Sequence, residues 1–177
     1  MKIFYSLIFI CFFIASTIAQ PITITSANMP VANDTLRYTN VQMNSVTNYT
    51  STGTNYFWDF SSVASTTSGV RNFKSALSTP YAFFFLQPGE YGEKIADTLL
   101  GTGQITITNY YSFYKKQTTP LNAFIADGVG LAISGIPVPC YYTDKDELCV
   151  FPMTYPKKDS TTFKFSTPTT TALPITY

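Results

Sequence analysis

Residues Gln104–Lys115 read QITITNYYSFYK, in which apolar and polar side chains alternate. A period of two places neighbouring side chains on opposite faces of a β-strand. One face then carries the apolar residues Ile105, Ile107, Tyr111 and Phe113. Because twelve residues is long for a strand, we expect a bulge or bend near Asn109. The stretch predicts a strand with one buried face.

Shorter stretches on both sides of this one also have strand character. Most of them alternate or are rich in aromatic residues, and turn residues separate them. Phe83–Leu86 is a continuous apolar run between Pro80 and Pro88, which is typical of a strand buried on both faces. We expect strands at Ile22–Thr25, Thr35–Tyr38, Tyr56–Phe60, Val70–Lys74, Phe83–Leu86 and Thr161–Ser166.

The remaining stretches are expected to be turns or irregular segments. Ser61–Gly69 is polar and predicts a turn, while Asp127-Gly128, Pro137 and Pro139 are expected to interrupt the segment that follows the long strand. Glu90–Asp97 is the best helix candidate, although two glycines weaken it. No stretch after the leader keeps a period of 3.6 residues, so strands dominate the prediction.

The composition favours the same fold class. Threonine, tyrosine and phenylalanine suit pleated, half-buried surfaces, and they number 27, 13 and 15. Hydrophobic residues make up 45% of the chain, enough for a core. We predict an all-β fold, an antiparallel β-sandwich of immunoglobulin-like or jelly-roll topology, over residues 20–177. Leu173–Tyr177 resembles the start of another strand, so we expect this domain to be truncated at its C-terminal end.

Residues 1–19 have the organisation of a secretory signal peptide. Lys2 precedes Ile3–Ile14, an apolar run of twelve residues that is too short to span a bilayer comfortably. Thr17-Ile18-Ala19 places small residues where signal peptidase cleaves, so we expect a mature N-terminus at Gln20. A membrane anchor is the alternative interpretation. No later run is long enough for a transmembrane span, and we expect a protein that is secreted or held at the outer cell surface.

The charge balance excludes two kinds of partner. Formal net charge is +1, and with Lys2 in the leader the rest of the chain has ten basic and ten acidic residues. A nucleic-acid interface and a polybasic membrane patch both need clustered lysine and arginine. We therefore expect no nucleic-acid partner and no electrostatic membrane docking.

The absence of histidine excludes several catalytic and metal sites. A Ser–His–Asp triad, a Cys–His pair and a histidine-ligated zinc cannot be built. Gly101-Thr102-Gly103 lacks the third glycine of a phosphate-binding loop. A carboxylate pair of the glycosidase kind remains open, with Asp59 and Glu90 among the candidates. The alternative is that these carboxylates lie at the surface or in turns, as most acidic side chains do.

Two cysteines remain after the leader, and their even number suggests a disulfide. Cys140 and Cys149 are separated by eight residues, and export would place them in an oxidising compartment. A bridge between them would close a loop of about ten residues and stabilise the fold by roughly 2–3 kcal/mol. Two buried free thiols are the alternative.

The one acidic cluster, Asp144-Lys145-Asp146-Glu147, lies between these cysteines. Hard cations bind several oxygen ligands on short loops, so calcium held by Asp144, Asp146 and Glu147 is a hypothesis. The EF-hand spacing is absent, and Lys145 interrupts the cluster. A turn that keeps a hairpin soluble is the favoured alternative, and no other cofactor is expected.

Two segments resemble known β modules. Val31–Tyr38, VANDTLRY, is similar to the turn-into-strand opening of bacterial immunoglobulin-like modules. Phe57–Ser61, FWDFS, is similar to the Trp-Asp-Phe core of PKD-type modules. The chain departs from that pattern at Ser62-Val63-Ala64, where Gly-Asp-Gly is expected, so a PKD domain is not assigned. Trp58, the single tryptophan, is expected in the core because it lies on an alternating strand, and stacking on a sugar is the alternative.

More broadly, the chain resembles exported Bacteroidota proteins that carry a C-terminal sorting domain for type IX secretion, although the sorting domain itself is missing here. Such bacteria O-glycosylate exported proteins at Asp-Ser/Thr motifs. The resemblance implies three acceptor residues in this chain, which are Thr35, Thr98 and Ser160.

The sequence therefore favours a non-catalytic exported or cell-surface β module with a structural, adhesion or binding role. The rival is a carbohydrate-binding module or a carbohydrate-active enzyme, using exposed tyrosines and carboxylates such as Asp59 or Glu90. The expected partners are glycans or cell-surface components. The enzyme question stays open, with a non-enzyme favoured.

Overall fold

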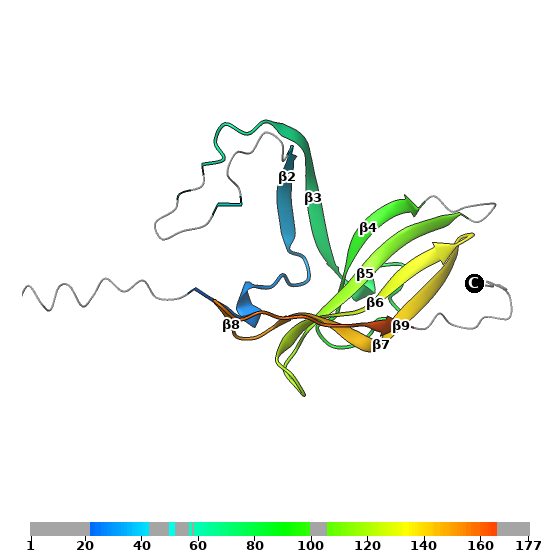
Figure 1. Cartoon of the computed structure of the whole chain (residues 1–177). Helices are drawn as coiled ribbons and strands as arrows, with labels where there is room; N and C mark the ends of the chain where they lie inside the picture. The colour runs from blue at the N-terminus through cyan, green and yellow to red at the C-terminus, as the bar shows by residue number, and fades with distance from the viewer. Residues whose placement is uncertain (1–21, 43–49, 52–56, 58, 100–105, 166–177) are drawn as a thin grey trace, which may run out of the picture.

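The computed structural model describes residues 22–42, 50–51, 57, 59–99 and 106–165, and within them the protein is all-β and antiparallel (Figure 1). Seven strands form a large sheet and two short strands form a second, in a sandwich-like arrangement. This confirms the predicted fold class. The elements are β1 (Thr23–Ile24), the 3₁₀ turn η2 (Ser26–Asn28), β2 (Thr35–Val41), β3 (Ser65–Ser75), the 3₁₀ turn η4 (Ala76–Ser78), β4 (Tyr91–Leu99), β5 (Ile107–Gln117), β6 (Ala123–Ile133), β7 (Ile136–Val150), β8 (Met153–Thr154) and β9 (Lys164–Phe165).

The large sheet follows chain order almost throughout. Its strands lie in the order β2-β3-β4-β5-β6-β7-β9, and β1 pairs with β8 in the small sheet. These connections form a meander, whereas immunoglobulin-like and jelly-roll domains use Greek-key connections. Only Phe73–Ser75 of β3 pairs with β4, so β2 and the rest of β3 form a ribbon that stands away from β4–β7 (Figure 1).

Polar side chains stabilise this ribbon across its strands. Thr39 and Ser68 lie 3.1 Å apart through their hydroxyls, and Asn40 Nδ2 donates to Thr67 Oγ1 at 3.0 Å. Every residue of β2 is exposed, including Leu36, Tyr38 and Val41, so no described layer buries either face of this strand. Ser61–Gly69 was expected to be a turn, and Ser61 and Ser62 do form one. The prediction is wrong for Ser65–Gly69, which pairs with β2 although its sequence does not alternate.

The long strand β5 confirms the strongest sequence signal, including its bend. Asn109 has a left-handed φ of 51°, and the pairing of β5 with β6 shifts between Thr108 and Tyr111. Asparagine tolerates this conformation better than most residues. The resulting bulge lets one long strand follow the curvature of the sheet.

Buried aromatic side chains form much of the core. The rings of Phe85 and Phe113 stack with centroids 3.8 Å apart and planes 6° apart, and Tyr81 packs edge-on against Phe113 at 5.9 Å. A second cluster contains Phe73, Tyr91, Phe124, Cys149 and Phe151. Full burial of one phenylalanine side chain stabilises a fold by about 1.5–3 kcal/mol, so these rings supply a large part of the driving force.

Two predicted elements are wrong in type. Phe83–Leu86 is no strand but part of a turn and loop, and among its residues only Phe85 is buried. Glu90–Asp97 is no helix, because Tyr91–Leu99 forms β4. Phe83–Leu86 resembles a buried strand because a loop that packs one ring inward can have the same apolar content. Glu90–Asp97 is a strand because Tyr91–Leu99 pairs with β5 along its length and with β3 at its start.

The expected breaks near Asp127-Gly128 are also wrong. Both residues lie within β6, and Pro137 and Pro139 lie within β7. This part of β7 has no described strand on its other side, because β9 pairs only with Tyr142 and Asp144. Proline is tolerated where its missing N–H faces such a free edge.

Several predictions fall partly or wholly outside the described residues. These are the signal peptide at 1–19, the truncated strand at 173–177 and, within the expected strand 56–60, Tyr56 and Trp58. Phe57 and Phe60 are described, and both are exposed and outside strands. No helix within the described ranges has the length and hydropathy needed to cross a membrane.

Candidate functional site

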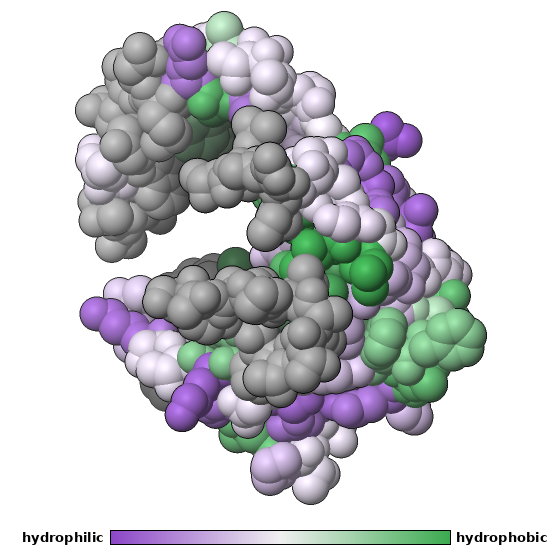
Figure 2. Space-filling model, turned by 90° about the vertical axis from the view of Figure 1, so that its right-hand side faces the viewer, coloured by the Kyte–Doolittle hydropathy of each residue, from purple (hydrophilic) through white to green (hydrophobic). Residues whose placement is uncertain are grey.

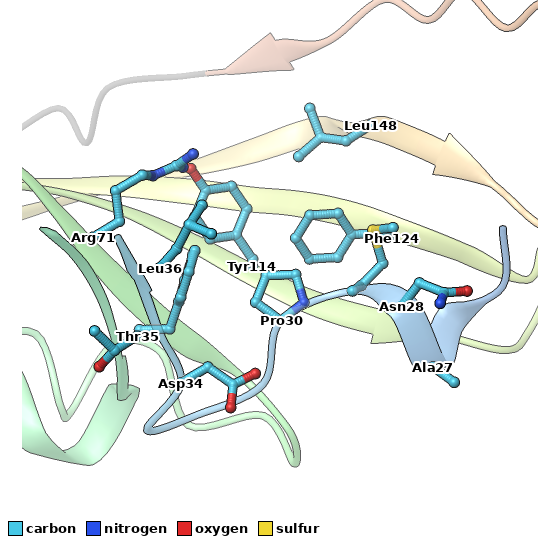
Figure 3. A pocket seen from close by; sticks show the side chains of 12 residues that line it. Ala27, Asn28, Pro30, Asp34, Thr35, Leu36, Arg71, Tyr114, Phe124 and Leu148 are labelled. Carbon is cyan, nitrogen blue, oxygen red and sulfur yellow. The ribbon is translucent and has the colours of Figure 1, made fainter. Parts of the chain in front are cut away.

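A pocket of about 560 Å³ opens where the N-terminal segment crosses the sheet (Figure 3). Residues from η2 to the start of β2 form one wall, and β3, β5, β6 and β7 supply the others. Figure 3 shows the rings of Tyr114 and Phe124 between Pro30 on one side and Leu148 on the other. The full lining is Ala27, Asn28, Met29, Pro30, Asp34, Thr35, Leu36, Arg71, Phe73, Tyr114, Phe124 and Leu148.

Aromatic side chains form the floor of this pocket. Tyr114 and Phe124 lie on the neighbouring strands β5 and β6, with centroids 5.5 Å apart and planes 26° apart. Phe124 also stacks against Tyr91, which is buried behind the floor, at 6.5 Å. A floor of stacked rings is rigid and apolar, which suits an apolar or aromatic ligand.

Hydrogen bonds hold the wall formed by the N-terminal segment. Tyr91 donates from its hydroxyl to the carbonyl of Pro30 at 2.6 Å, and burial raises the pKa of Tyr91, so the hydroxyl keeps its proton. Asp34 Oδ2 accepts from the backbone N–H of Val31 at 2.8 Å. Asn33 completes this turn with a left-handed φ of 75°. The wall is thereby fixed to the core of the sheet.

Arg71 lies at one end of the pocket, and its charge is already neutralised. Its Nη2 donates to Glu93 Oε2 at 2.5 Å, and its Nε donates to Glu93 Oε1. The hydrogen bonds to Glu93 raise the pKa of Arg71. The guanidinium also lies 5.6 Å from the ring centroid of Phe73. A ligand therefore meets a paired charge beside an apolar surface.

The polar lining groups are engaged in structural bonds. Asp34 and Arg71 have the partners named above, and Thr35 Oγ1 donates to Asn72 Oδ1 at 3.2 Å. No lining residue is a nucleophile held against a base, which general acid–base or covalent catalysis would need. The arrangement suits binding.

Sequence reasoning missed this pocket because its lining comes from segments far apart in the chain. Val31–Tyr38 was singled out for its resemblance to other modules, and it does supply Asp34, Thr35 and Leu36. Nothing in the local pattern indicated that Phe124 and Leu148 would meet that segment. The pocket is identified by the register of the sheet strands, which brings these distant segments together.

The two candidate carboxylates lie in contrasting places. Asp59 is exposed, and hydrogen bonds from the Ser61 side chain and from the Ser61 backbone N–H, the latter at 2.9 Å, lower the pKa of Asp59. Glu90 is buried, and this burial raises its pKa. Glu90 interacts electrostatically with Lys115 and Lys145, so it belongs to a buried charged cluster and not to the pocket.

Cys140 and Cys149 are both free thiols, so the predicted disulfide is not formed in this structure. Both lie on β7, where they pair with Val129 and Phe124 of β6. Those positions are five residues apart, which corresponds to roughly 15 Å along an extended strand, whereas bridged cysteines need Cα atoms within about 7 Å. The sequence suggested a loop between them, but one strand runs through both positions.

The predicted calcium ligands do not form a metal site. Among the residues that the structure describes, no three histidine, cysteine or acidic side chains gather closely enough to hold a metal ion. Asp144 pairs with Lys164 of β9, and Asp146 pairs with Ala126 of β6. Glu147 Oε2 accepts from Thr161 Oγ1 at 2.9 Å.

The three predicted glycosylation residues are all exposed. Thr35 begins β2, Thr98 lies near the end of β4, and Ser160 lies in the segment before β9. Accessibility is necessary for modification, and each residue meets that requirement.

No known protein gives a function for the pocket, so what it binds is inferred from its geometry alone. No protein-family model matches this chain, and neither a curated protein nor a solved structure matches it.

Proposed function

We propose that this chain is a non-catalytic β module, exported or held at the cell surface, that binds an apolar or aromatic group in the pocket. The observation that carries the proposal is the pocket itself: stacked Tyr114 and Phe124 form its floor, and its polar rim is already hydrogen-bonded. Apolar concave sites with few polar groups are typical of ligand sites.

The rest of the surface supports an interaction role. Only 12% of residues are charged, and many large apolar side chains are exposed. Figure 2 shows hydrophobic residues gathered in patches on one face, among pale and purple polar residues. Contiguous apolar patches on a protein surface mark interaction sites.

Titration with the fluorescent probe anilinonaphthalene sulfonate tests the pocket. The expected result is saturable binding at one site, weakened roughly tenfold by Leu148→Asp, which puts a charge at the pocket rim. Leu148 is 45% exposed, so the substitution spares the core. Ile136→Asp is the matched control, because Ile136 lies on the same strand, is 62% exposed and is outside the pocket. Equal effects of both variants would contradict the proposal.

Export is supported by the leader pattern and by the exposure of the three glycosylation residues. N-terminal sequencing of protein recovered outside the cytoplasm is expected to begin at Gln20. Peptide mass spectrometry is expected to find glycan on at least one of Thr35, Thr98 and Ser160. Protein that keeps Lys2 and remains in the membrane would favour an anchor instead.

A carbohydrate-binding module is the second candidate, favoured by a separate aromatic group on β7, on β9 and at the residue before β9. Tyr142 and Phe163 stack with centroids 5.0 Å apart, and Phe163 and Phe165 have planes only 18° apart and are half-exposed. Exposed rings of this kind can stack on sugar faces. A glycan array that shows saturable binding, lost in Phe163→Ala, would favour this candidate over the pocket.

A further inference from the structure

Asp127 is the most deeply buried acidic residue among those the structure describes. It lies in β6, and its side chain is 2% exposed. Lys145 Nζ contacts its Oδ1 directly, and Lys115 Nζ lies 3.9 Å from the same oxygen. Two ammonium groups therefore converge on one carboxylate inside the protein.

The sheet register brings these groups together. Ala126 pairs with Asp146, and Gly128 pairs with Tyr141, so Asp127 alone stands opposite residues 142–145 of β7. Gly128 allows the close approach of β7, because a Cβ there would lie 2.6 Å from the carbonyl oxygen of Cys140. This bulge delivers Lys145 to Asp127 from the neighbouring strand.

A second buried carboxylate belongs to the same cluster. Glu90 is 5% exposed, and its Oε2 accepts from the backbone N–H of Gln87 at 3.0 Å. Its other oxygen, Oε1, is buried without a hydrogen-bond partner. Lys115 Nζ contacts Gln87 Oε1, which links Glu90 to the Asp127 side of the cluster. A buried unpaired carboxylate oxygen is costly, and it calls for an explanation in terms of proton chemistry or function.

Aromatic side chains lie beside the cluster, because a Cβ at Gly128 would be 3.1 Å from Phe85 and Tyr141 interacts electrostatically with Glu90. Phe85 stacks on Phe113 and packs against Tyr141 at 5.1 Å. Tyr141 donates from its hydroxyl to the carbonyl of Phe84 at 2.7 Å, which fixes the loop over β7. A buried aspartate and a buried glutamate thus lie beside aromatic rings, while the Lys145 side chain is partly exposed, at 34%.

From this juxtaposition we infer that Lys145 and Asp127 are joined by a spontaneous intramolecular amide bond, with Glu90 relaying the proton. The ammonium of Lys145 first gives one proton to the Asp127 carboxylate, which leaves a neutral amine beside a neutral acid. The amine nitrogen attacks Asp127 Cγ and forms the C–N bond. The C–O bond then breaks, and Glu90 carries the second nitrogen proton to the departing hydroxyl. The products are one amide and one water, and no oxidant or reductant takes part.

The local electrostatics favour these protonation states. Burial, together with Lys115, lowers the pKa of Lys145, which favours the nucleophilic amine. Burial raises the pKa of Glu90, which suits a group that takes up and releases a proton. Lys115, at 3.9 Å from Asp127 Oδ1, is placed to stabilise negative charge on that oxygen during attack.

The bond would tie β6 to β7 covalently where their pairing is interrupted. It would close the chain between residues 127 and 145, as a disulfide closes a loop, and it would restrict the unfolded chain in the same way. An amide needs no oxidising environment, which suits a module whose two described cysteines are free.

Intact-mass spectrometry of the full mature chain tests the inference. The wild-type protein is expected to be lighter than its sequence by the mass of one water, whereas Lys145→Arg and Asp127→Ala are expected at their full sequence masses. Tryptic mapping is expected to yield a branched peptide that joins Lys145 to Asp127. Glu90→Gln is expected to keep the full mass while its circular dichroism matches that of wild type. A wild-type chain of full mass, cleaved normally after Lys145, overturns the inference.

A matched control is needed because Asp127-Gly128 can also lose water by forming a succinimide. That product keeps its reduced mass in Lys145→Arg and gives no branched peptide, so this pattern also overturns the inference. Lys115→Arg separates the two lysines: loss of the branch in this variant, with its retention in Lys145→Arg, would contradict the assignment of Lys145.

Discussion

Tyr81 donates a hydrogen bond from its phenolic hydroxyl to the backbone carbonyl of Asn109, 2.7 Å away. Tyr81 is fully buried and belongs to the loop that covers the aromatic core, while Asn109 is the left-handed residue at which β5 bends. One bond therefore connects the loop to the bulge. The same ring packs against Gly130 of β6, so Tyr81 contacts both the bulge of β5 and the neighbouring strand β6.

Replacing Tyr81 by phenylalanine tests this connection. The ring stays in place, but the Asn109 carbonyl loses its partner in a partly buried site. We expect a loss of about 1–2 kcal/mol in the free energy of unfolding, measured by urea denaturation at neutral pH. An unchanged midpoint would show that water or another donor replaces the hydroxyl.

The same pair predicts a pH dependence. Burial raises the pKa of Tyr81 from 10.0 to about 12, so the folded state favours the neutral phenol. The stabilisation is complete below pH 10, the unfolded value, and is lost as pH rises towards 12. The stability difference between wild type and Tyr81→Phe is therefore expected to be constant at neutral pH and to shrink above pH 10. A difference that grows in that range would contradict the raised pKa.

Asn109 itself predicts a contrast between two substitutions. At a φ of 51°, alanine carries a steric cost of about 1 kcal/mol, whereas glycine adopts this conformation freely. Thermal unfolding is expected to rank Asn109→Gly close to wild type and Asn109→Ala below both. Equal stability of the two variants would mean that β5 relaxes its bend without cost.

Gly130 and Gly69 each lie close to a tyrosine ring, and they test whether burial of that ring decides the cost of adding a Cβ. A Cβ at position 130 would lie 2.7 Å from the ring of the fully buried Tyr81, and a Cβ at position 69 would meet the ring of Tyr38. Tyr38 is exposed and can rotate away, whereas Tyr81 is enclosed. We expect Gly130→Ala to cost about 1–3 kcal/mol and Gly69→Ala less than about 0.5 kcal/mol. The reverse order in urea denaturation would refute this packing.

The sequence predicted elements where burial follows a strand period, and it failed where burial follows tertiary contacts. Gln104–Lys115 alternates because β5 has one covered face, and its bend at Asn109 was also predicted. Phe83–Leu86 reads as a buried strand, yet only Phe85 packs inward, on Phe113. Local pattern cannot distinguish these cases, because the loop's position depends on strands that follow it in the chain.

The contacts within the candidate sites depend on strand register even more than the strands themselves do. Cys140 and Cys149 are separated because they lie far apart on one strand, β7, whereas Lys145 reaches Asp127 through a bulge in the pairing of β6 with β7 that no local motif signals. Glu90 was recognised as a candidate carboxylate, but its burial was not. The pocket likewise needs Phe124 and Leu148 to meet Ala27–Leu36, a segment that lies about 90 and about 115 residues earlier in the chain, respectively.

In the ion pair of Arg71 with Glu93 the two side chains differ in exposure. Removing only Arg71 is therefore expected to destabilise the fold more than removing both charges. The Glu93 side chain is 4% exposed and the Arg71 side chain is 44% exposed. Arg71→Met leaves a buried carboxylate without its partner and is expected to cost about 3 kcal/mol in urea denaturation. Adding Glu93→Gln removes the uncompensated charge, so the double variant is expected to recover most of that loss.

The exposed pair of Lys94 with Asp97 is the matched control for this experiment. Lys94→Met is expected to leave the urea midpoint unchanged, since solvent screens an exposed pair and hydrates the carboxylate that remains. If Arg71→Met proved as mild as Lys94→Met, Glu93 would have to be reached by water in the folded protein. The pocket beside Arg71 would then be wetter than its aromatic floor indicates, and the case for an apolar ligand would weaken with it.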